Sequence, residues 1–427
     1  MWLIAGGHVW QGSEKGFVDG LDILVKGSRI VAVGPGLRGS QSAEGAHVID
    51  ASGHIVIPGL VNAHTHVAMT LLRSYADDLP LFEWLNEKIW PVEAKLTADD
   101  VYWGTMLGIV EMVRAGVTTF SDMYFFMEDV ARAVRESGVR ACLSEGMFDG
   151  GLWDRQFDAA RNLAADWHEA ENGRIRVMLG PHSPYATLEG LKKVAKSARE
   201  LGVGVHIHLS ETAREVEESR KTHGLSPIQV AEREGLFEAT VLAAHCVHVD
   251  DADMEILQRY GASVAHNPTS NMKLGSGRAP VQAMLARGIN VALATDGASS
   301  NNNLDLLEEA RLAAYLAKME GDPSALPAAT CLDMATRRGA QALGFDDVGA
   351  IEPGFQADIV LIEASGPQWT PLHDACANLI YSAASSDVST VMVAGEIIME
   401  RRILKTIDER RVLQEAARRG LDLVSRR

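Results

Sequence analysis

The spacing of hydrophobic residues along the 427-residue chain is typical of β-strands at both ends and of alternating strands and helices between them. Residues 1–54 contain short apolar runs separated by glycines and polar residues, and residues 357–399 show the same pattern. Neither end has enough strands for a stable sheet of its own, so we expect the two ends to pair. The prediction is a small β-sandwich domain made of residues 1–56 and 349–427. Its C-terminal part is expected to end in a charged amphipathic helix over 407–427.

The middle of the chain reads as a repeated unit of strand and helix. Seven short apolar runs follow the first one, which covers residues 55–60, and each run ends in polar residues. These runs lie at 117–122, 139–143, 175–182, 203–208, 241–245, 262–266 and 289–296. Apolar residues at helical spacing occur between them, for example over 98–115, 187–201 and 250–260. Eight strands separated by helices predict an α/β fold, a (β/α)8 barrel of the TIM type over residues 57–348.

Composition and charge limit the classes of function that the protein can have. With 40 Lys and Arg against 57 Asp and Glu, the net charge is −17, which would repel a nucleic-acid backbone. No apolar run reaches about 18 residues and the first residues do not resemble a targeting segment, so no membrane association is expected. The four cysteines, Cys142, Cys246, Cys331 and Cys376, lie far apart, which is typical of reduced thiols in a cytoplasmic protein. They form no C-x-x-C motif, and this excludes the zinc nucleobase deaminases that depend on one.

Polar residues gather at one end of the predicted barrel. In this fold the carboxyl ends of the strands face the active site. The polar residues at these ends are His64, His66, Asp122, His182, His208, His245, His266 and Asp296. A single histidine at a strand end is more often an ordinary polar residue than a ligand, but six of the 14 histidines fall in these positions. Their joint placement predicts a site for one metal ion.

Four of these residues can form the metal site. His64 and His66 are two residues apart, so they project from the same face of the first strand. His208 ends the fifth strand, and Asp296 ends the eighth, which neighbours the first once the barrel closes. Three nitrogens and one carboxylate leave a position for water, whose pKa a bound metal lowers towards neutrality. We expect one divalent metal per chain, zinc in the first place, with iron and manganese as alternatives for this ligand set.

Two further residues are candidates for proton transfer. Glu211 follows His208 by three residues, where its carboxylate could reach both water and substrate; the alternative is a carboxylate at the start of a helix. His245 could hydrogen-bond the attacking water, and Asp296 could accept a proton from it. The fourth strand ends at His182 without the lysine that bridges two metals in binuclear hydrolases of this architecture. One metal is therefore favoured, and His182 becomes a candidate contact for a substrate nitrogen.

Six stretches of sequence carry a resemblance to a known family. They are N-A-H-T-H-V-A-M-T-L-L-R at 62–73, G-P-H-S-P-Y at 180–185, H-I-H-L-S-E-T at 206–212, A-A-H-C-V-H at 243–248, H-N-P-T-S-N-M-K-L-G at 266–275 and T-D-G-A-S-S-N-N at 295–302. The chain resembles the amidohydrolase superfamily over nearly its whole length, and the 5-methylthioadenosine/S-adenosylhomocysteine deaminases in particular. This resemblance implies the same four metal ligands, a proton shuttle at Glu211 and a water contact at His245.

The resemblance also implies contacts with a nucleoside. His182 would contact the purine, and Ser300 would approach the substrate beside the metal. Trp84 and Glu93 would cover the nucleoside and bind its ribose hydroxyls; they lie in the segment 73–96, which is long for a βα loop and is expected to form a lid. Without the family resemblance, the sequence is equally consistent with Trp84 as a core residue and with Glu93 as a charged residue on a helix face. The implied reaction is hydrolytic deamination at C6 of an adenine ring, which yields an inosine-type product and ammonia.

The group on the ribose 5′ carbon is less closely specified. Family members that accept S-adenosylhomocysteine place an arginine after the third strand, where this chain has Glu145. A second arginine of the family corresponds to Arg155, after a shortened loop at 149–154. An acidic residue near a substrate carboxylate is unfavourable. The sequence therefore favours methylthioadenosine, adenosine or 5′-deoxyadenosine over S-adenosylhomocysteine.

Other functions remain open at this point. Hydrolases of s-triazines and deaminases of guanine or pterins share the metal ligands and differ in the pocket. An inactive amidohydrolase-like scaffold is opposed by the presence of every ligand and of Glu211 and His245. The expected partner is a small nucleoside substrate, and self-association into a homo-oligomer is left open.

Overall fold

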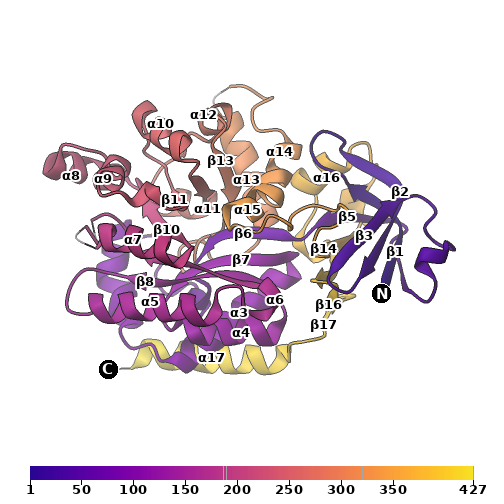
Figure 1. Cartoon of the computed structure of the whole chain (residues 1–427), viewed down its shortest axis with the longest axis horizontal. Helices are drawn as coiled ribbons and strands as arrows, with labels where there is room; N and C mark the ends of the chain where they lie inside the picture. Colours follow the sequence, from indigo (N-terminus) through magenta and orange to yellow (C-terminus); the bar gives the residue numbers. More distant parts are fainter. Residues whose placement is uncertain (186, 189, 320, 427) are drawn as a thin grey trace.

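The computed structural model describes all residues except 186, 189, 320 and 427, and it contains two sheets (Figure 1). One is an eight-stranded sheet in which the strands follow each other in chain order. Its strands are β6 (Leu60–Thr65), β7 (Val117–Tyr124), β8 (Arg140–Met147), β9 (Ile175–Pro181), β10 (Gly204–Leu209), β11 (Val241–His245), β12 (Ser263–His266) and β13 (Asn290–Leu293). All ladder pairs in this sheet are parallel, and almost every strand residue is buried, because helices cover the outer face.

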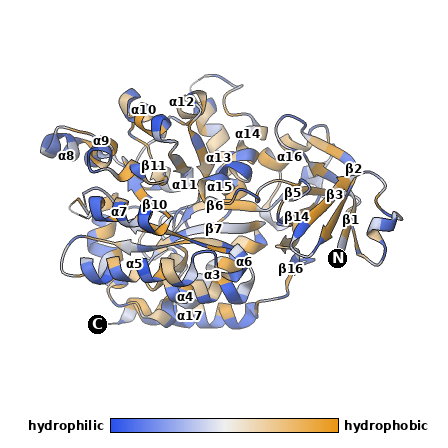
Figure 2. Cartoon of the chain, in the orientation of Figure 1, coloured by the Kyte–Doolittle hydropathy of each residue, from blue (hydrophilic) through white to orange (hydrophobic). Residues whose placement is uncertain are grey.

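Helices follow the strands as the spacing of apolar residues predicts. The larger ones are α3 (Ala98–Arg114), α4 (Met127–Ser137), α5 (Trp153–Trp167), α7 (Leu191–Leu201), α8 (Ala213–His223), α10 (Asp251–Tyr260) and α13 (Leu306–Lys318). Shorter ones are α6 (Ala170–Gly173), α9 (Pro227–Arg233), α11 (Pro268–Lys273), α12 (Val281–Ala286), α14 (Ala328–Met334), α15 (Arg337–Ala342) and α16 (Ala375–Tyr381). Hydrophobic residues follow the strands and hydrophilic ones the outward faces of helices such as α8 (Figure 2). The predicted (β/α)8 barrel is confirmed.

The barrel closes between its first and last strands through side-chain hydrogen bonds and one backbone hydrogen bond. Among the described residues no ladder joins β6 to β13, which end the strand order. Instead Asn62 Nδ2 donates to Thr295 Oγ1 over 2.7 Å, and the Thr295 N–H donates back to Asn62 Oδ1 over 3.0 Å. The Asp296 N–H then donates to the His64 carbonyl over 3.0 Å. These bonds bring the carboxyl ends of the first and eighth strands together.

The second sheet combines both ends of the chain. Its strands are β1 (Trp2–Trp10), β2 (Phe17–Lys26), β3 (Arg29–Gly34), β4 (His47–Asp50), β5 (His54–Pro58), β14 (Ile359–Glu363), β15 (Val388–Val393), β16 (Glu396–Glu400) and β17 (Ile403–Leu404). β5 joins the two ends, since it pairs in parallel with β1 and antiparallel with β14. The predicted β unit from both chain ends is therefore confirmed, and its nine strands form one continuous hydrogen-bonded sheet.

The apolar run 55–60 belongs to both sheets. Its first part lies in β5 and its last residue begins β6, so sheet membership changes at Gly59, whereas we expected the barrel from residue 57. A side chain at Gly59 would collide with Thr118 of β7, so the chain passes from one sheet to the other at a point of close contact. The division of the chain into domains stays a prediction.

Two peripheral segments complete the molecule. The expected lid is helical and consists of α1 (Leu81–Glu83), η3 (Trp84–Ile89) and α2 (Trp90–Glu93). The predicted terminal helix is α17 (Glu409–Ser425), which packs along α3 of the barrel (Figure 1). Arg419 and Arg426 hold this end of the chain to the buried carboxylate of Asp100, at the start of α3.

Candidate metal centre and active site

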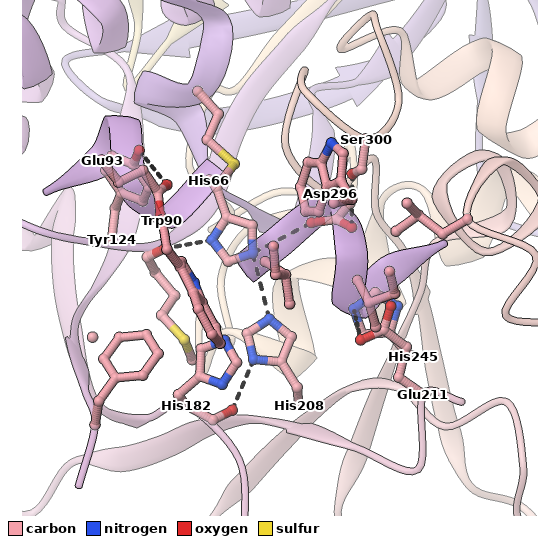
Figure 3. A pocket seen from close by; sticks show the side chains of 18 of the residues that line it. His66, Trp90, Glu93, Tyr124, His182, His208, Glu211, His245, Asp296 and Ser300 are labelled. Carbon is pink, nitrogen blue, oxygen red and sulfur yellow. Dashed lines mark hydrogen bonds and ion pairs between the residues drawn. The ribbon is translucent and has the colours of Figure 1, made fainter. Parts of the chain in front are cut away.

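Three imidazoles and one carboxylate converge at the carboxyl ends of the barrel strands. His66 Nε2 lies 3.4 Å from His208 Nε2 and 3.4 Å from Asp296 Oδ1 (Figure 3). His64 Nε2 lies 3.5 Å from Asp296 Oδ1. His64 comes from β6, His66 directly follows this strand, His208 comes from β10 and Asp296 from the residues after β13. The structure thus brings together all four residues that we predict as metal ligands.

Hydrogen bonds on the far side of two rings determine where their protons lie. His66 Nδ1 faces the Met123 carbonyl at 2.6 Å, and His208 Nδ1 faces the His182 carbonyl at 2.8 Å. A carbonyl oxygen can only accept, so both Nδ1 atoms carry hydrogen and both Nε2 atoms present lone pairs. Two lone pairs 3.4 Å apart repel each other unless a cation lies between them. His64 Nε2 is also buried without a hydrogen-bond partner, so this donor set fits a divalent metal.

The charges of these groups suit the same role. Burial lowers the pKa of His64 to about 4 and holds the pKa of His208 well below its usual value, so both rings are neutral near pH 7. Burial would raise the pKa of Asp296, but the imidazoles of His64 and His66 beside it hold this pKa well below the usual range. Asp296 Oδ2 also accepts hydrogen bonds from Ser270 Oγ (2.6 Å) and Ser300 Oγ (3.1 Å). The carboxylate is therefore ionised and held in one orientation.

Glu211 and His245 lie beside this cluster. Glu211 Oε2 is 3.9 Å from His245 Nε2, and both side chains are buried (Figure 3). Burial raises the pKa of Glu211. Burial would lower the pKa of His245, but the carboxylates of Glu211 and Asp296 raise it more. His245 Nδ1 donates to Asn271 Oδ1 over 2.9 Å, and its Nε2 faces Glu211.

The alternative role for Glu211, a carboxylate at the start of a helix, is filled by other residues. Thr212 caps α8, since its hydroxyl accepts the N–H of Glu215 over 3.1 Å. The Glu215 carboxylate in turn accepts the backbone N–H of Glu211 over 2.7 Å. The backbone of Glu211 is fixed by these contacts, and its own carboxylate faces the cavity.

A cavity opens above the cluster, with the lid segment on one side. It is lined by His66, Met69, Leu81, Trp84, Leu85, Trp90, Glu93, Met123, Tyr124, Phe125, Gly146, Phe148, His182, Tyr185, His208, Glu211, His245, Leu274, Asp296 and Ser300. Trp84 is buried, as a core residue would be, and it also forms part of the cavity wall. Glu93 is buried, and its carboxylate accepts the Tyr124 hydroxyl over 2.6 Å. Burial raises the pKa of Glu93 to about 7, which an exposed helix charge would not show.

Some residues singled out in the sequence lie elsewhere. Arg155 is exposed on α5 and does not line the cavity, so the structure does not bring this predicted substrate contact into the site. Glu145 accepts the Met127 N–H over 3.1 Å at the start of α4, rather than facing the cavity. Asp122 accepts the Val67 N–H over 2.9 Å, and His266 is buried outside the cavity wall. His182 and Ser300 line the cavity as predicted, although the Ser300 hydroxyl is engaged by Asp296.

Sequence reasoning missed four polar partners of the site. Tyr124 follows Asp122 by two residues, so strand alternation could have placed it at the same barrel end. Ser270 and Asn271 belong to the stretch 266–275 that carries the family resemblance, yet nothing local indicates that they hold Asp296 and His245. The fourth is His206, two residues before His208, which contacts His64.

The fold and this site define a barrel hydrolase with a metal centre, and the comparisons agree. A family model described as Amidohydrolase family matches residues 55–398. A 5-methylthioadenosine/S-adenosylhomocysteine deaminase of Dictyoglomus thermophilum is 54% identical over 383 residues, which cover 89% of this chain and 90% of that protein.

Two solved structures extend the comparison. An adenosine deaminase from Xanthomonas campestris with bound zinc has a TM-score of 0.93 at 36% identity, covering 99% of this chain and 98% of that one. Atrazine chlorohydrolase from Arthrobacter aurescens TC1, complexed with zinc, has a TM-score of 0.91 at 28% identity, covering 98% and 100%. The chain belongs to the amidohydrolase family and, within it, to the group of 5-methylthioadenosine/S-adenosylhomocysteine deaminases.

Proposed function

We propose that this enzyme hydrolytically deaminates adenine nucleosides at C6, releasing ammonia and an inosine-type product. The observation that carries the proposal is the convergence of three imidazole Nε2 lone pairs and an ionised carboxylate beside the Glu211–His245 pair, at the base of a cavity. A relative that is 54% identical is named a 5-methylthioadenosine/S-adenosylhomocysteine deaminase, and a protein of solved structure that is 36% identical is an adenosine deaminase.

The residues of the chain divide the chemistry between them. We assign the metal, zinc in the first place, to His64, His66, His208 and Asp296; when bound, it activates a water for attack. Glu211 accepts a proton from the water and delivers it to the ring nitrogen N1 as the oxygen–C6 bond forms. His245, whose Nε2 faces Glu211, contacts the attacking oxygen. Glu211 then takes the remaining proton of the attacking oxygen and passes it to the amino group, the C6–N bond breaks and ammonia leaves.

The cavity walls fit the rest of a nucleoside. With C6 beside Glu211, the ribose extends away from the cluster towards Glu93, whose carboxylate can accept hydrogen bonds from sugar hydroxyls. The His182 ring, whose pKa burial lowers to about 3, is neutral and can contact a purine nitrogen. Trp84 covers the bound molecule from the lid side.

The wall also bears on the 5′ substituent. Phe125 and Phe148 line the cavity with ring centroids 5.9 Å apart, and the described lining residues include no lysine or arginine. An amino-acid group such as that of S-adenosylhomocysteine would bring a carboxylate without a cationic partner, at a cost in desolvation. We therefore keep the preference for uncharged 5′ groups, on the ground of this apolar wall rather than of a direct contact with Glu145.

The second candidate, hydrolysis of an s-triazine, draws on the likeness to the atrazine chlorohydrolase. The buried Glu93–Tyr124 pair disfavours it. A triazine ring with short alkyl groups offers this carboxylate no hydroxyl, whereas a ribose does.

The test is ammonia release by zinc-loaded protein with adenosine, methylthioadenosine, 5′-deoxyadenosine and S-adenosylhomocysteine side by side. We expect turnover of the three uncharged nucleosides, with kcat/KM for S-adenosylhomocysteine about tenfold or more lower, since one missing charge partner is worth 1.4 kcal/mol or more. Comparable values for all four would contradict the 5′ preference alone. No turnover of any of them by metal-loaded protein would contradict the deaminase assignment, and triazines and guanine would then be tried.

Location and assembly stay predictions. None of the described helices is long and apolar enough to cross a membrane. All four cysteines are buried and unpaired, which supports the cytoplasmic location expected from their spacing. A homo-oligomer also stays open.

A further inference from the structure

His206 is a fully buried histidine of β10 whose role the proposed reaction does not use. It lies two residues before His208, so strand alternation directs both rings into the barrel interior. His206 Nε2 is 2.8 Å from His64 Nδ1. Its other nitrogen, Nδ1, is 3.3 Å from Ser121 Oγ and 3.5 Å from Ser144 Oγ. These two serines come from β7 and β8, so the ring spans the barrel interior between His64 and a pair of hydroxyls.

His64 differs from the two other imidazole ligands in the partner of its Nδ1. Backbone carbonyls face Nδ1 of His66 and His208, and a carbonyl admits only one tautomer. His64 Nδ1 faces another imidazole, which can either donate or accept. If His206 donated, the His64 proton would lie on Nε2, which faces Asp296 Oδ1 at 3.5 Å, and His64 could not bind a metal. The tautomer of His64 therefore depends on His206.

We propose that His206 is the positioning residue that keeps the Nε2 lone pair of His64 available to the metal. His206 donates its Nδ1–H to the hydroxyls of Ser121 and Ser144, which leaves its own Nε2 to accept the Nδ1–H of His64. The ring also fixes the orientation of His64, since the two rings meet at an interplanar angle of 83°. A partner of this kind behind a metal ligand commonly strengthens metal binding about 10- to 100-fold.

The test compares three substitutions by zinc affinity, measured by competition with a chromophoric chelator. In His206→Gln the amide oxygen can reach the former position of Nε2 and accept from His64, so an affinity close to wild type is expected. His206→Asn is one methylene shorter; its amide reaches the serines but not His64, so the affinity should fall about 10- to 100-fold. The zinc affinity of His206→Leu should fall by the same factor. The double variant S121A/S144A should also weaken binding, because His206 Nδ1 then has no acceptor.

Two further measurements separate this role from a structural one. Thermal unfolding in excess chelator shows whether each metal-free variant is folded, and the visible spectrum of the cobalt(II)-loaded protein reports the ligand geometry. The His206→Gln and His206→Asn pair decides the matter even if His206→Leu fails to fold, because the two differ only in reach. Equal zinc affinity in these two variants, or wild-type affinity in His206→Leu, would overturn the inference.

The inference rests on the proposed metal centre and not on the substrate. Failure of the deaminase assay would leave it unchanged, because the readout is metal affinity. A wild-type protein that binds no zinc, in contrast, would overturn both the centre and the role of His206.

Discussion

At the scale of single residues, the partner behind each imidazole decides what the site can do. The H-x-H motif places His64 and His66 on one strand face, but it does not determine which ring nitrogen faces the site. The Met123 carbonyl does this for His66, and His206 does it for His64. The same holds for His245, whose Nε2 faces Glu211 because Asn271 holds its Nδ1.

Glu211 gives the sharpest prediction at this scale. Glu211→Gln keeps the shape of the side chain but removes its ability to carry protons, so kcat should fall about 100- to 10,000-fold. Zinc content should stay unchanged, because the four proposed ligands remain. The measurement is steady-state ammonia release together with zinc analysis of the same preparation.

A matched control lies on the neighbouring helix. Glu217 is exposed on α8, and Glu217→Gln should leave both kcat and zinc content unchanged. If Glu211→Gln kept wild-type turnover, the proton shuttle would have to be another group.

At the scale of elements, one buried ion pair joins the barrel to the terminal sheet. Arg140 of β8 donates to both carboxylate oxygens of Asp358, over 2.9 and 3.0 Å, and neither side chain is accessible to solvent. The same carboxylate accepts the Ala394 N–H over 2.7 Å, just after β15. The Asp358 carbonyl accepts the N–H of Gly59, where the chain crosses between sheets. The Arg140–Asp358 pair therefore holds the barrel strand β8 against the terminal sheet.

Removing one partner of this pair should be costly. Arg140→Ala would leave the Asp358 carboxylate buried without its cation, which typically destabilises a protein by about 3–5 kcal/mol. We expect a clearly lower Tm and a lower midpoint in urea unfolding. The exposed pair Lys196–Glu200 on α7 is the control, because Lys196→Ala should change neither measurement. Equal effects of the two substitutions would show that the buried pair does not hold the junction.

At the scale of the whole molecule, the metal centre links distant parts of the barrel. Its proposed ligands lie in or directly after β6, β10 and β13, the first, fifth and eighth strands. Because β6 and β13 are joined by side-chain and single backbone bonds rather than by a ladder, a metal between His64 and Asp296 would reinforce the closure.

Removal of the metal should therefore destabilise the fold as well as abolish activity. At free zinc about a thousandfold above Kd, binding contributes about 4 kcal/mol to the free energy of unfolding. We expect chelation to lower Tm by several degrees and zinc addition to restore it, as measured by differential scanning fluorimetry. An unchanged Tm after complete removal would mean that the centre does not contribute to barrel closure.

Much of this architecture could be predicted from local patterns in the chain. Strand and helix periods follow from which residues face the core, and polar residues at strand ends stand out against apolar runs. For this reason the eight barrel strands, most strands at both chain ends, and the positions of His64, His208 and Asp296 could be predicted without a structure. The break at Gly59 was not, because one continuous apolar run serves two sheets and only the close approach of Thr118 decides where it divides.

The sequence by itself determined the elements of this protein and the residue types that meet at the barrel mouth, because both follow from periodicities within a few residues. Only the tertiary structure decided the directions of individual side chains. Glu145 faces the start of α4 rather than the cavity, Arg155 faces solvent, and Tyr124 reaches Glu93 from 31 positions away. These side-chain directions depend on packing between segments that are remote along the chain, and a local sequence pattern cannot predict such contacts.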